Sequence, residues 1–169
     1  METVYFKEQP CHTCGTLPAV GSIAPGFNLA GAALNEVKDT DFKGKRVVLN
    51  IFPSLDTDVC ARSVRRFNEE AAGLKDTAVV CVSMDLPCAM GRFCTIEGIK
   101  DVTPASAFRS PEFVKDYGVM LCDGPLKGLL ARAVIVLDTD RRVIYRQLVE
   151  EITDEPDYEA AISVLRQGR

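Results

Sequence analysis

Residues 47–83 read VVLNIFPSLDTDVCARSVRRFNEEAAGLKDTAVVCVS, and this stretch decides the fold. Its two ends, 47–52 and 78–83, are apolar runs rich in β-branched residues, which predicts two strands. Between them, apolar residues recur at the spacing of a helix face, at Val64, Phe67, Ala71 and Leu74. Strands that are apolar on both faces and joined by a helix are typical of a sheet with helices on both sides. The stretch therefore predicts the centre of an α/β fold.

The rest of the chain supplies further elements. Two more strands are expected at 133–137 and 143–148, joined as an antiparallel pair by the polar turn 138–142. Helices are expected to end near 73–76 and to occupy 87–98, 111–117 and 156–165. At the start, Thr3–Phe6 and Cys11–Thr16 flank Gln9-Pro10 and predict a hairpin. The expected fold is one domain, 1–169, with a mixed central β-sheet flanked by helices and an N-terminal β-hairpin; a thioredoxin-like arrangement is the simplest match.

Composition excludes several classes of function. The 169 residues carry a net charge of −4 without a basic stripe, so nucleic acid is not an expected partner. The first residues do not resemble a signal peptide, and no apolar run approaches the ~20 residues of a membrane span, so we expect no membrane partner and a cytoplasmic location. Seven cysteines, an odd number, indicate free thiols in a reducing compartment rather than a disulfide scaffold.

Cys60 is the candidate nucleophile. Asp56 and Thr57 are suitable helix N-caps, which places Cys60 in the first turn of a helix, where backbone amides and the helix dipole favour a thiolate. Thr57 is spaced to put its hydroxyl beside the sulfur, and Pro53 stiffens the loop before it. Spacing alone supports core packing of Cys60 equally well.

The string Phe52–Asn68 contains Pro-x-x-x-Thr-x-x-Cys, formed by Pro53, Thr57 and Cys60. This string resembles the peroxidatic loop of the peroxiredoxins, specifically of the thiol peroxidase subfamily, an atypical two-cysteine type. The resemblance extends to four further segments, at 19–27, 92–94, 116–119 and 123–133. It implies that Cys60 attacks the peroxide, that Pro53 and Thr57 shape its pocket, and that Arg132 stabilises the thiolate and the charge that develops on oxygen.

The resemblance implies further properties of the enzyme. It implies reduction of hydrogen peroxide and organic hydroperoxides, thioredoxin as the reductant, a homodimer, and no bound cofactor. Local sequence leaves four cysteines open as the partner of Cys60: Cys81, Cys88, Cys94 and Cys122. The resemblance selects Cys94 as the resolving cysteine, joined to Cys60 by an intramolecular disulfide, and we expect both helices to unwind locally to close it.

Cys11-His12-Thr13-Cys14 supports two alternative functions. A Cys-x-x-Cys motif suggests a redox pair or half of a metal site, as in a non-enzymatic redox-sensing or metal-sensing module. A thiol-disulfide oxidoreductase would need a reactive Cys-x-x-Cys at the start of a helix, where this chain has Thr57-Asp58-Val59-Cys60. His12 is the only histidine, so no second Cys/His pair completes a metal site, and no metal is expected. In a strand, residues three apart point to opposite faces, which disfavours a bond between Cys11 and Cys14.

Overall fold

The computed structural model describes residues 1–71 and 73–167. A seven-stranded sheet with strand order β4-β3-β7-β6-β5-β8-β9 forms its centre. Its strands are β3 (Asn28–Gly31), β4 (Glu36–Lys38), β5 (Arg46–Ile51), β6 (Thr77–Ser83), β7 (Thr103–Ser106), β8 (Ala133–Leu137) and β9 (Val143–Leu148). β5, β6 and β7 run parallel, and the other neighbouring pairs are antiparallel. The predicted mixed sheet is confirmed, and the three most apolar predicted strands lie together at its centre.

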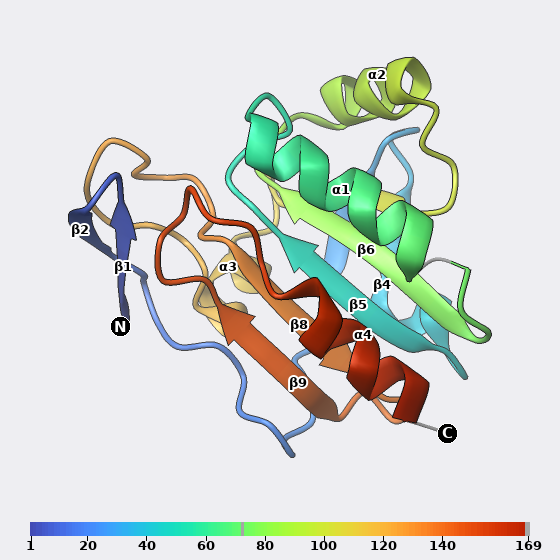
Figure 1. Ribbon diagram of the computed structural model, residues 1–169. Coiled ribbons are helices and arrows are strands. Elements are labelled where there is room, and N and C mark those ends of the chain that lie inside the picture. Colours follow the sequence, from blue (N-terminus) through green and yellow to red (C-terminus); the bar gives the residue numbers. More distant parts are fainter. Residues whose placement is uncertain (72, 168–169) are drawn as a thin grey trace.

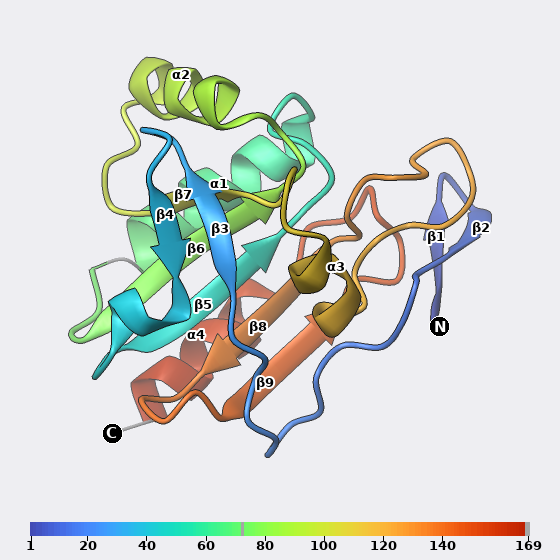
Figure 2. The same cartoon turned by 180° about the vertical axis from the view of Figure 1, so that it is seen from behind.

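Helices cover both faces of this sheet. α1 (Asp58–Glu70) and α4 (Tyr158–Gln167) lie on one face (Figure 1), and α3 (Pro111–Tyr117) lies on the other (Figure 2). α2 (Pro87–Glu97) packs against β7, and a short 3-10 helix, η1 (Asp39–Phe42), precedes β5. Because side chains alternate along a strand, β5 sends Val48 to the α1 and α4 face and Leu49 to the α3 face. The central strands are therefore apolar on both sides, as their sequences predict.

The N-terminal hairpin is formed by β1 (Thr3–Phe6) and β2 (Gln9–His12). The predicted second strand at 11–16, with Gln9-Pro10 as the turn, is wrong. The turn is Lys7-Glu8, with φ of 51° and 67°, and Pro10 lies within the strand opposite Tyr5. Neither Lys nor Glu usually adopts this left-handed conformation, so the sequence carries no standard turn signal there.

Main-chain hydrogen bonds attach the hairpin to the segment that follows β9. Tyr5 N donates to Glu150 O at 2.7 Å, and Ile152 N donates to Tyr5 O at 2.8 Å. Behind these bonds, Val4 and Cys11 pack with Leu121 and Ile152 in a small separate core. The hairpin is thereby fixed against 150–152, a segment that also contacts the candidate active site.

The sequence missed four short elements: β3, β4, β7 and η1. These strands have three or four residues and contain Gly, Pro or charged residues, which are depleted in strands, so pairing within the sheet rather than propensity forms them. α1 ends at Glu70, before the predicted stop at 73–76, and α4 occupies 158–167 rather than 156–165. No helix in the described part of the chain is long and apolar enough to cross a membrane.

Candidate active site

Cys60 lies where the chain leaves the centre of the sheet. β5 ends at Ile51, a loop follows, and Thr57 occupies the N-cap position of α1. Cys60 is the third residue of α1 and therefore lies in its first turn, as predicted. Its side chain is fully buried and packs with Phe52, Val64 and Phe67. The first turn of a helix presents backbone N–H groups without intrahelical acceptors, which favours a negative charge nearby.

Arg132 brings a positive charge to this sulfur. It directly precedes β8, and only 2% of the residue is exposed. Its Nη2 donates a hydrogen bond to Cys60 Sγ at 3.3 Å. Its Nη1 is buried and has no hydrogen-bond partner among the described residues. A buried guanidinium with one unpaired nitrogen is costly for stability, which indicates that this nitrogen serves a ligand.

The segment at 149–152 holds Arg132 in place. Arg132 Nε donates to Ile152 O at 2.8 Å, and Val149 N donates to Arg132 O at 2.9 Å. Because Ile152 N is bonded in turn to Tyr5 O, the N-terminal hairpin supports the guanidinium through one intervening residue. This support explains why a hairpin outside the main sheet lies at the site.

A pocket of about 160 Å³ opens beside Arg132. Pro53 and Thr57 line it, so the structure brings together three of the residues selected from the sequence. Its other walls are mainly apolar: Val59 of α1 lies next to Thr57 in the chain, and three distant segments contribute Phe6 of β1, Leu126 and Leu129 of the loop before β8, and Ile152. The sequence gives no signal for these wall residues, because an apolar side chain in a loop looks the same whether it lines a pocket or a core.

Thr57 differs in detail from the prediction. Its hydroxyl donates to Ser54 O at 3.0 Å and does not cap the helix. The single hydroxyl proton is therefore used within the loop and is not directed to the sulfur. The lone pairs of the oxygen stay available at the pocket, where they can accept a hydrogen bond from a ligand.

Cys94 lies in α2 and packs half-buried against the same core cluster as Cys60. Burial raises the pKa of its thiol. α2 is loosely held, with only Pro87 and Met90 buried among its 11 residues, and Gly91 lies in its middle. A helix with so few buried contacts unfolds locally at low cost. All seven cysteines are free thiols in this structure.

The other cysteines occupy different environments. Cys81 is fully buried in β6 and close enough to Cys94 to interact with it electrostatically; burial raises its pKa to about 12. Cys88, at the start of α2, and Cys122 are both exposed.

Cys11 and Cys14 do not form a pair. Cys11 lies in β2 and is buried in the small core under the hairpin, and Cys14 is exposed beyond the end of β2. His12 Nδ1 is engaged by Asp123 Oδ2 at 2.6 Å. Within the described residues, no group of three or more His, Cys, Asp or Glu side chains is placed to hold a metal ion. The geometry therefore offers no support for either alternative function built on these cysteines.

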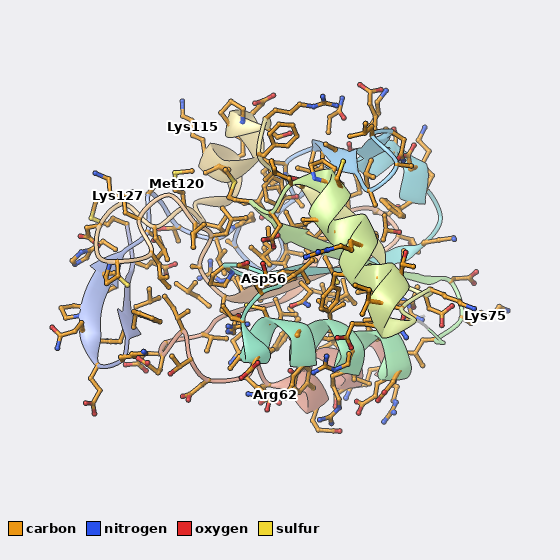
Figure 3. All side chains as sticks on the ribbon, turned by 90° about the horizontal axis from the view of Figure 1, so that it is seen from above. Asp56, Arg62, Lys75, Lys115, Met120 and Lys127 are labelled. Carbon is orange, nitrogen blue, oxygen red and sulfur yellow. The ribbon has the colours of Figure 1, made fainter. Side chains whose placement is uncertain are left out.

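Figure 3 looks down on this end of the sheet, with Asp56 between α1 and α2, and Lys127 in the loop beside the N-terminal hairpin. The site thus combines a buried thiol, a cation, a pocket and a second thiol on a loosely packed helix. This arrangement suits a thiolate that attacks a small electrophile and then forms a disulfide with a second thiol.

Comparison with known proteins identifies the family. The model of the Redoxin family matches residues 19–162. The chain is 55% identical to a thiol peroxidase of Corynebacterium glutamicum, over 98% of this chain and 99% of the relative. It is 53% identical to a thiol peroxidase of Mycobacterium tuberculosis over the same shares of both chains.

Solved structures agree with the sequence comparison. A peroxiredoxin-like protein from Aquifex aeolicus superposes with a TM-score of 0.93 at 41% identity, covering 99% of this chain and 97% of the other. A thiol peroxidase from Chromobacterium violaceum superposes with a TM-score of 0.87 at 22% identity, covering 98% and 95%, and supports the fold alone. The thioredoxin-like fold is thereby confirmed, and the chain belongs to the Redoxin family as a peroxiredoxin-type enzyme of the thiol peroxidase group.

Proposed function

We propose that this thiol peroxidase reduces hydroperoxides with Cys60 as the nucleophile and Cys94 as the resolving thiol. One observation carries the proposal: Arg132 Nη2 lies 3.3 Å from Cys60 Sγ, at the start of a helix and beside an apolar pocket. Pro53, Thr57 and Arg132 form the pocket around the reacting atoms, and the reaction requires no cofactor.

The first step is a displacement at the O–O bond. The Cys60 thiolate attacks the terminal oxygen of the hydroperoxide, an S–O bond forms, and the O–O bond breaks. The unpaired Nη1 of Arg132 and the backbone amides of the helix start stabilise charge on the two oxygens, while Thr57 accepts the peroxide proton in a hydrogen bond. The departing oxygen takes up a proton and leaves as an alcohol or water, and Cys60 is left as a sulfenic acid.

The second step joins Cys60 to Cys94. The Cys94 sulfur attacks the Cys60 sulfur, an S–S bond forms, and the sulfenic oxygen leaves as water. Both residues lie on helices in this structure, so the loop before α1 and the middle of α2 must rearrange first. Thioredoxin, as a dithiol, then reduces the disulfide and returns both thiols.

The pocket walls favour organic hydroperoxides alongside hydrogen peroxide. Phe6, Leu126 and Ile152 offer apolar surface next to the cation, which suits a molecule with a peroxide group at one end and a hydrocarbon body at the other. Hydrogen peroxide has no such body and gains nothing from these walls.

A homodimer and a cytoplasmic location complete the proposal. Several large apolar side chains are exposed, which suits a subunit interface: Leu34, Leu86, Ile96 and Phe108. The free thiols suit a reducing compartment.

The test is hydroperoxide consumption with a thioredoxin system, in the wild type and in Cys60→Ser, Cys94→Ser and Cys88→Ser variants. Cys88 is the matched control because it is an exposed cysteine on the same helix as Cys94. We expect Cys60→Ser to abolish turnover, Cys94→Ser to stop after one turnover, and Cys88→Ser to match the wild type. Mass spectrometry of the oxidised wild type should find the Cys60–Cys94 disulfide; full activity of Cys60→Ser would refute the assignment.

A further inference from the structure

The Asp85 carboxylate joins two segments that carry the reacting cysteines. Asp85 lies between the end of β6 and the start of α2. Its Oδ1 accepts a hydrogen bond from Ser54 Oγ at 2.8 Å, and its Oδ2 accepts from Leu55 N at 2.8 Å and from Ser83 Oγ at 2.6 Å. Two of the three donors belong to the loop before α1, and the third belongs to β6. Hydrogen bonds to a carboxylate are stronger than those between neutral groups.

Asp85 itself is held firmly at the sheet. Its backbone N donates to Ser83 Oγ at 3.2 Å, and Ser106 Oγ of β7 donates to its carbonyl oxygen. Asp85 is therefore attached to the ends of two parallel strands, to β6 through its carboxylate and backbone N and to β7 through its carbonyl oxygen, and the loop is the partner that can leave.

Hydrogen bonds link Ser54, and through it Asp85, to the N-cap residue of α1. Ser54 O accepts hydrogen bonds from both Thr57 N at 3.2 Å and Thr57 Oγ1 at 3.0 Å. Ser54 Oγ also accepts from Asp56 N at 3.2 Å. Leu55, the other residue held by Asp85, is buried in the core cluster that contains Cys60. The position of the first turn of α1, and so of Cys60, therefore depends on bonds that end at Asp85.

Asp85 also lies at the groove between this loop and α2. The groove has a volume of about 200 Å³ and is lined by Leu55, Asp56, Asp85 and Phe93, among others. Because Cys60 is fully buried on α1, the proposed disulfide with Cys94 requires the Cys60 loop to move relative to α2, and the bonds from Ser54 and Leu55 to Asp85 oppose that movement.

We propose that Asp85 is a positioning residue, a latch that keeps residues 54–57 in the peroxide-reactive arrangement and opens when Cys60 and Cys94 join. This inference rests on the proposed function. The latch favours the first chemical step and slows the second. It also sets how long the sulfenic acid survives, and therefore how often a second peroxide molecule oxidises it to sulfinic acid.

Asp85→Asn tests the latch with little change in shape. The amide keeps one oxygen acceptor but replaces the other with an NH₂ donor, so at least one of the three donors loses its partner. Sulfenic acid formation is followed by rapid quenching, dimedone trapping and mass spectrometry in a Cys94→Ser background, and disulfide formation is followed in the full chain. We expect Asp85→Asn to slow the first step about tenfold, to speed the second step, and to reduce the sulfinic fraction at a given peroxide dose.

Two further variants make the result decisive. Ser54→Ala removes one of the two loop donors and should shift both rates in the same directions by less. Asp140→Asn changes an exposed carboxylate in the turn between β8 and β9, outside the latch, and should leave both rates as in the wild type. Both steps slowed in Asp85→Asn, or both within twofold of the wild type, would overturn the latch. Absence of Cys60 sulfenic acid in the Cys94→Ser protein with Asp85 intact would instead overturn the proposed function.

Discussion

Replacing Arg132 with methionine removes the cation from the site while retaining a side chain of similar length. The guanidinium makes two hydrogen bonds in the free enzyme, to Ile152 O at 2.8 Å and to Cys60 Sγ at 3.3 Å. A third nitrogen, Nη1, is buried and unpaired among the described residues. The perturbation therefore removes both the partner of the thiolate and the donor that we assign to the peroxide oxygens.

The magnitude follows from the donors that are lost. Removing one preorganised donor from a developing oxyanion costs about 100- to 1,000-fold in rate, or ~2.7–4 kcal/mol. We expect kcat/KM of Arg132→Met for hydroperoxide to fall by at least this factor. Arg132→Lys keeps the charge, but one ammonium group cannot reproduce the fork that reaches both Ile152 O and the sulfur, so we expect a loss of about tenfold or more.

The assay is the second-order rate of Cys60 oxidation, followed by competition with a peroxidase of known rate, because the chain has no tryptophan to report it. Arg62→Met is the matched control, since Arg62 lies on α1, is about half exposed and forms a long ion pair of 3.7 Å with Glu155. Thermal unfolding checks that each variant is folded at the assay temperature. A folded Arg132→Met with a rate within threefold of Arg62→Met would refute the assigned role.

Three further predictions follow from the same structure. Phe6→Ala should raise KM for bulky organic hydroperoxides several-fold and leave the rate with hydrogen peroxide unchanged, as steady-state kinetics with both substrates will show; equal effects on both would contradict the wall assignment. Burial raises the pKa of Cys81 to about 12, so N-ethylmaleimide at pH 8 should label Cys81 at least about 100-fold more slowly than the exposed Cys122. The labelling rate of Cys81 should rise at higher pH. Peptide mapping measures the labelling of both cysteines, and comparable rates would contradict the burial of Cys81. Hydrogen bonds from His12 lower the pKa of Asp123, so the stability that this carboxylate contributes is present above the ordinary carboxyl range and is lost as the pH falls through the lowered pKa. The free energies of unfolding in urea of wild type and Asp123→Asn should therefore differ near neutral pH and converge in acid. A difference that stays constant with pH would contradict this linkage.

The sequence predicts the centre of this fold well and its margins poorly. β5, β6 and β8 are apolar on both faces because helices or loops cover both sides of them. Burial on both faces produces runs of consecutive apolar residues, which the sequence shows directly. β7 contains Pro104 and is too short to show a period, and it exists because it pairs with β6 and β3. The Lys7-Glu8 turn is fixed by the strands that it joins rather than by its own residues.

The candidate site shows the same division. The placement of Cys60 follows from local signals, namely a strand end, a cap residue and the helical spacing after it. In the sequence, Arg132 is a lone cation before an apolar strand. Its contact with Cys60 Sγ joins residues 72 positions apart, so the spacing of residues does not predict it. The sequence does not predict a role for Asp85, because acidic residues after a strand are also common in ordinary loops.

Burial alone does not distinguish the proposed nucleophile, Cys60, from Cys81. Cys60 and Cys81 are both essentially removed from solvent, with 0% and 2% exposure. Cys81 has one long hydrogen bond, from Asn50 Nδ2 at 3.8 Å, and a pKa raised by burial, so its thiol stays protonated. Cys60 instead has a guanidinium nitrogen at 3.3 Å, the first turn of a helix around it, and a pocket beside that guanidinium. Because the thiolate is the nucleophile, we assign the chemistry to the buried thiol whose surroundings supply positive charge together with a path for the substrate. An Asn50→Arg substitution would place a positive charge beside Cys81 but would not open a pocket there. We therefore expect Cys81 to stay unreactive toward peroxide in that variant, because the position of the pocket, and not the number of cysteines, determines where peroxide reacts.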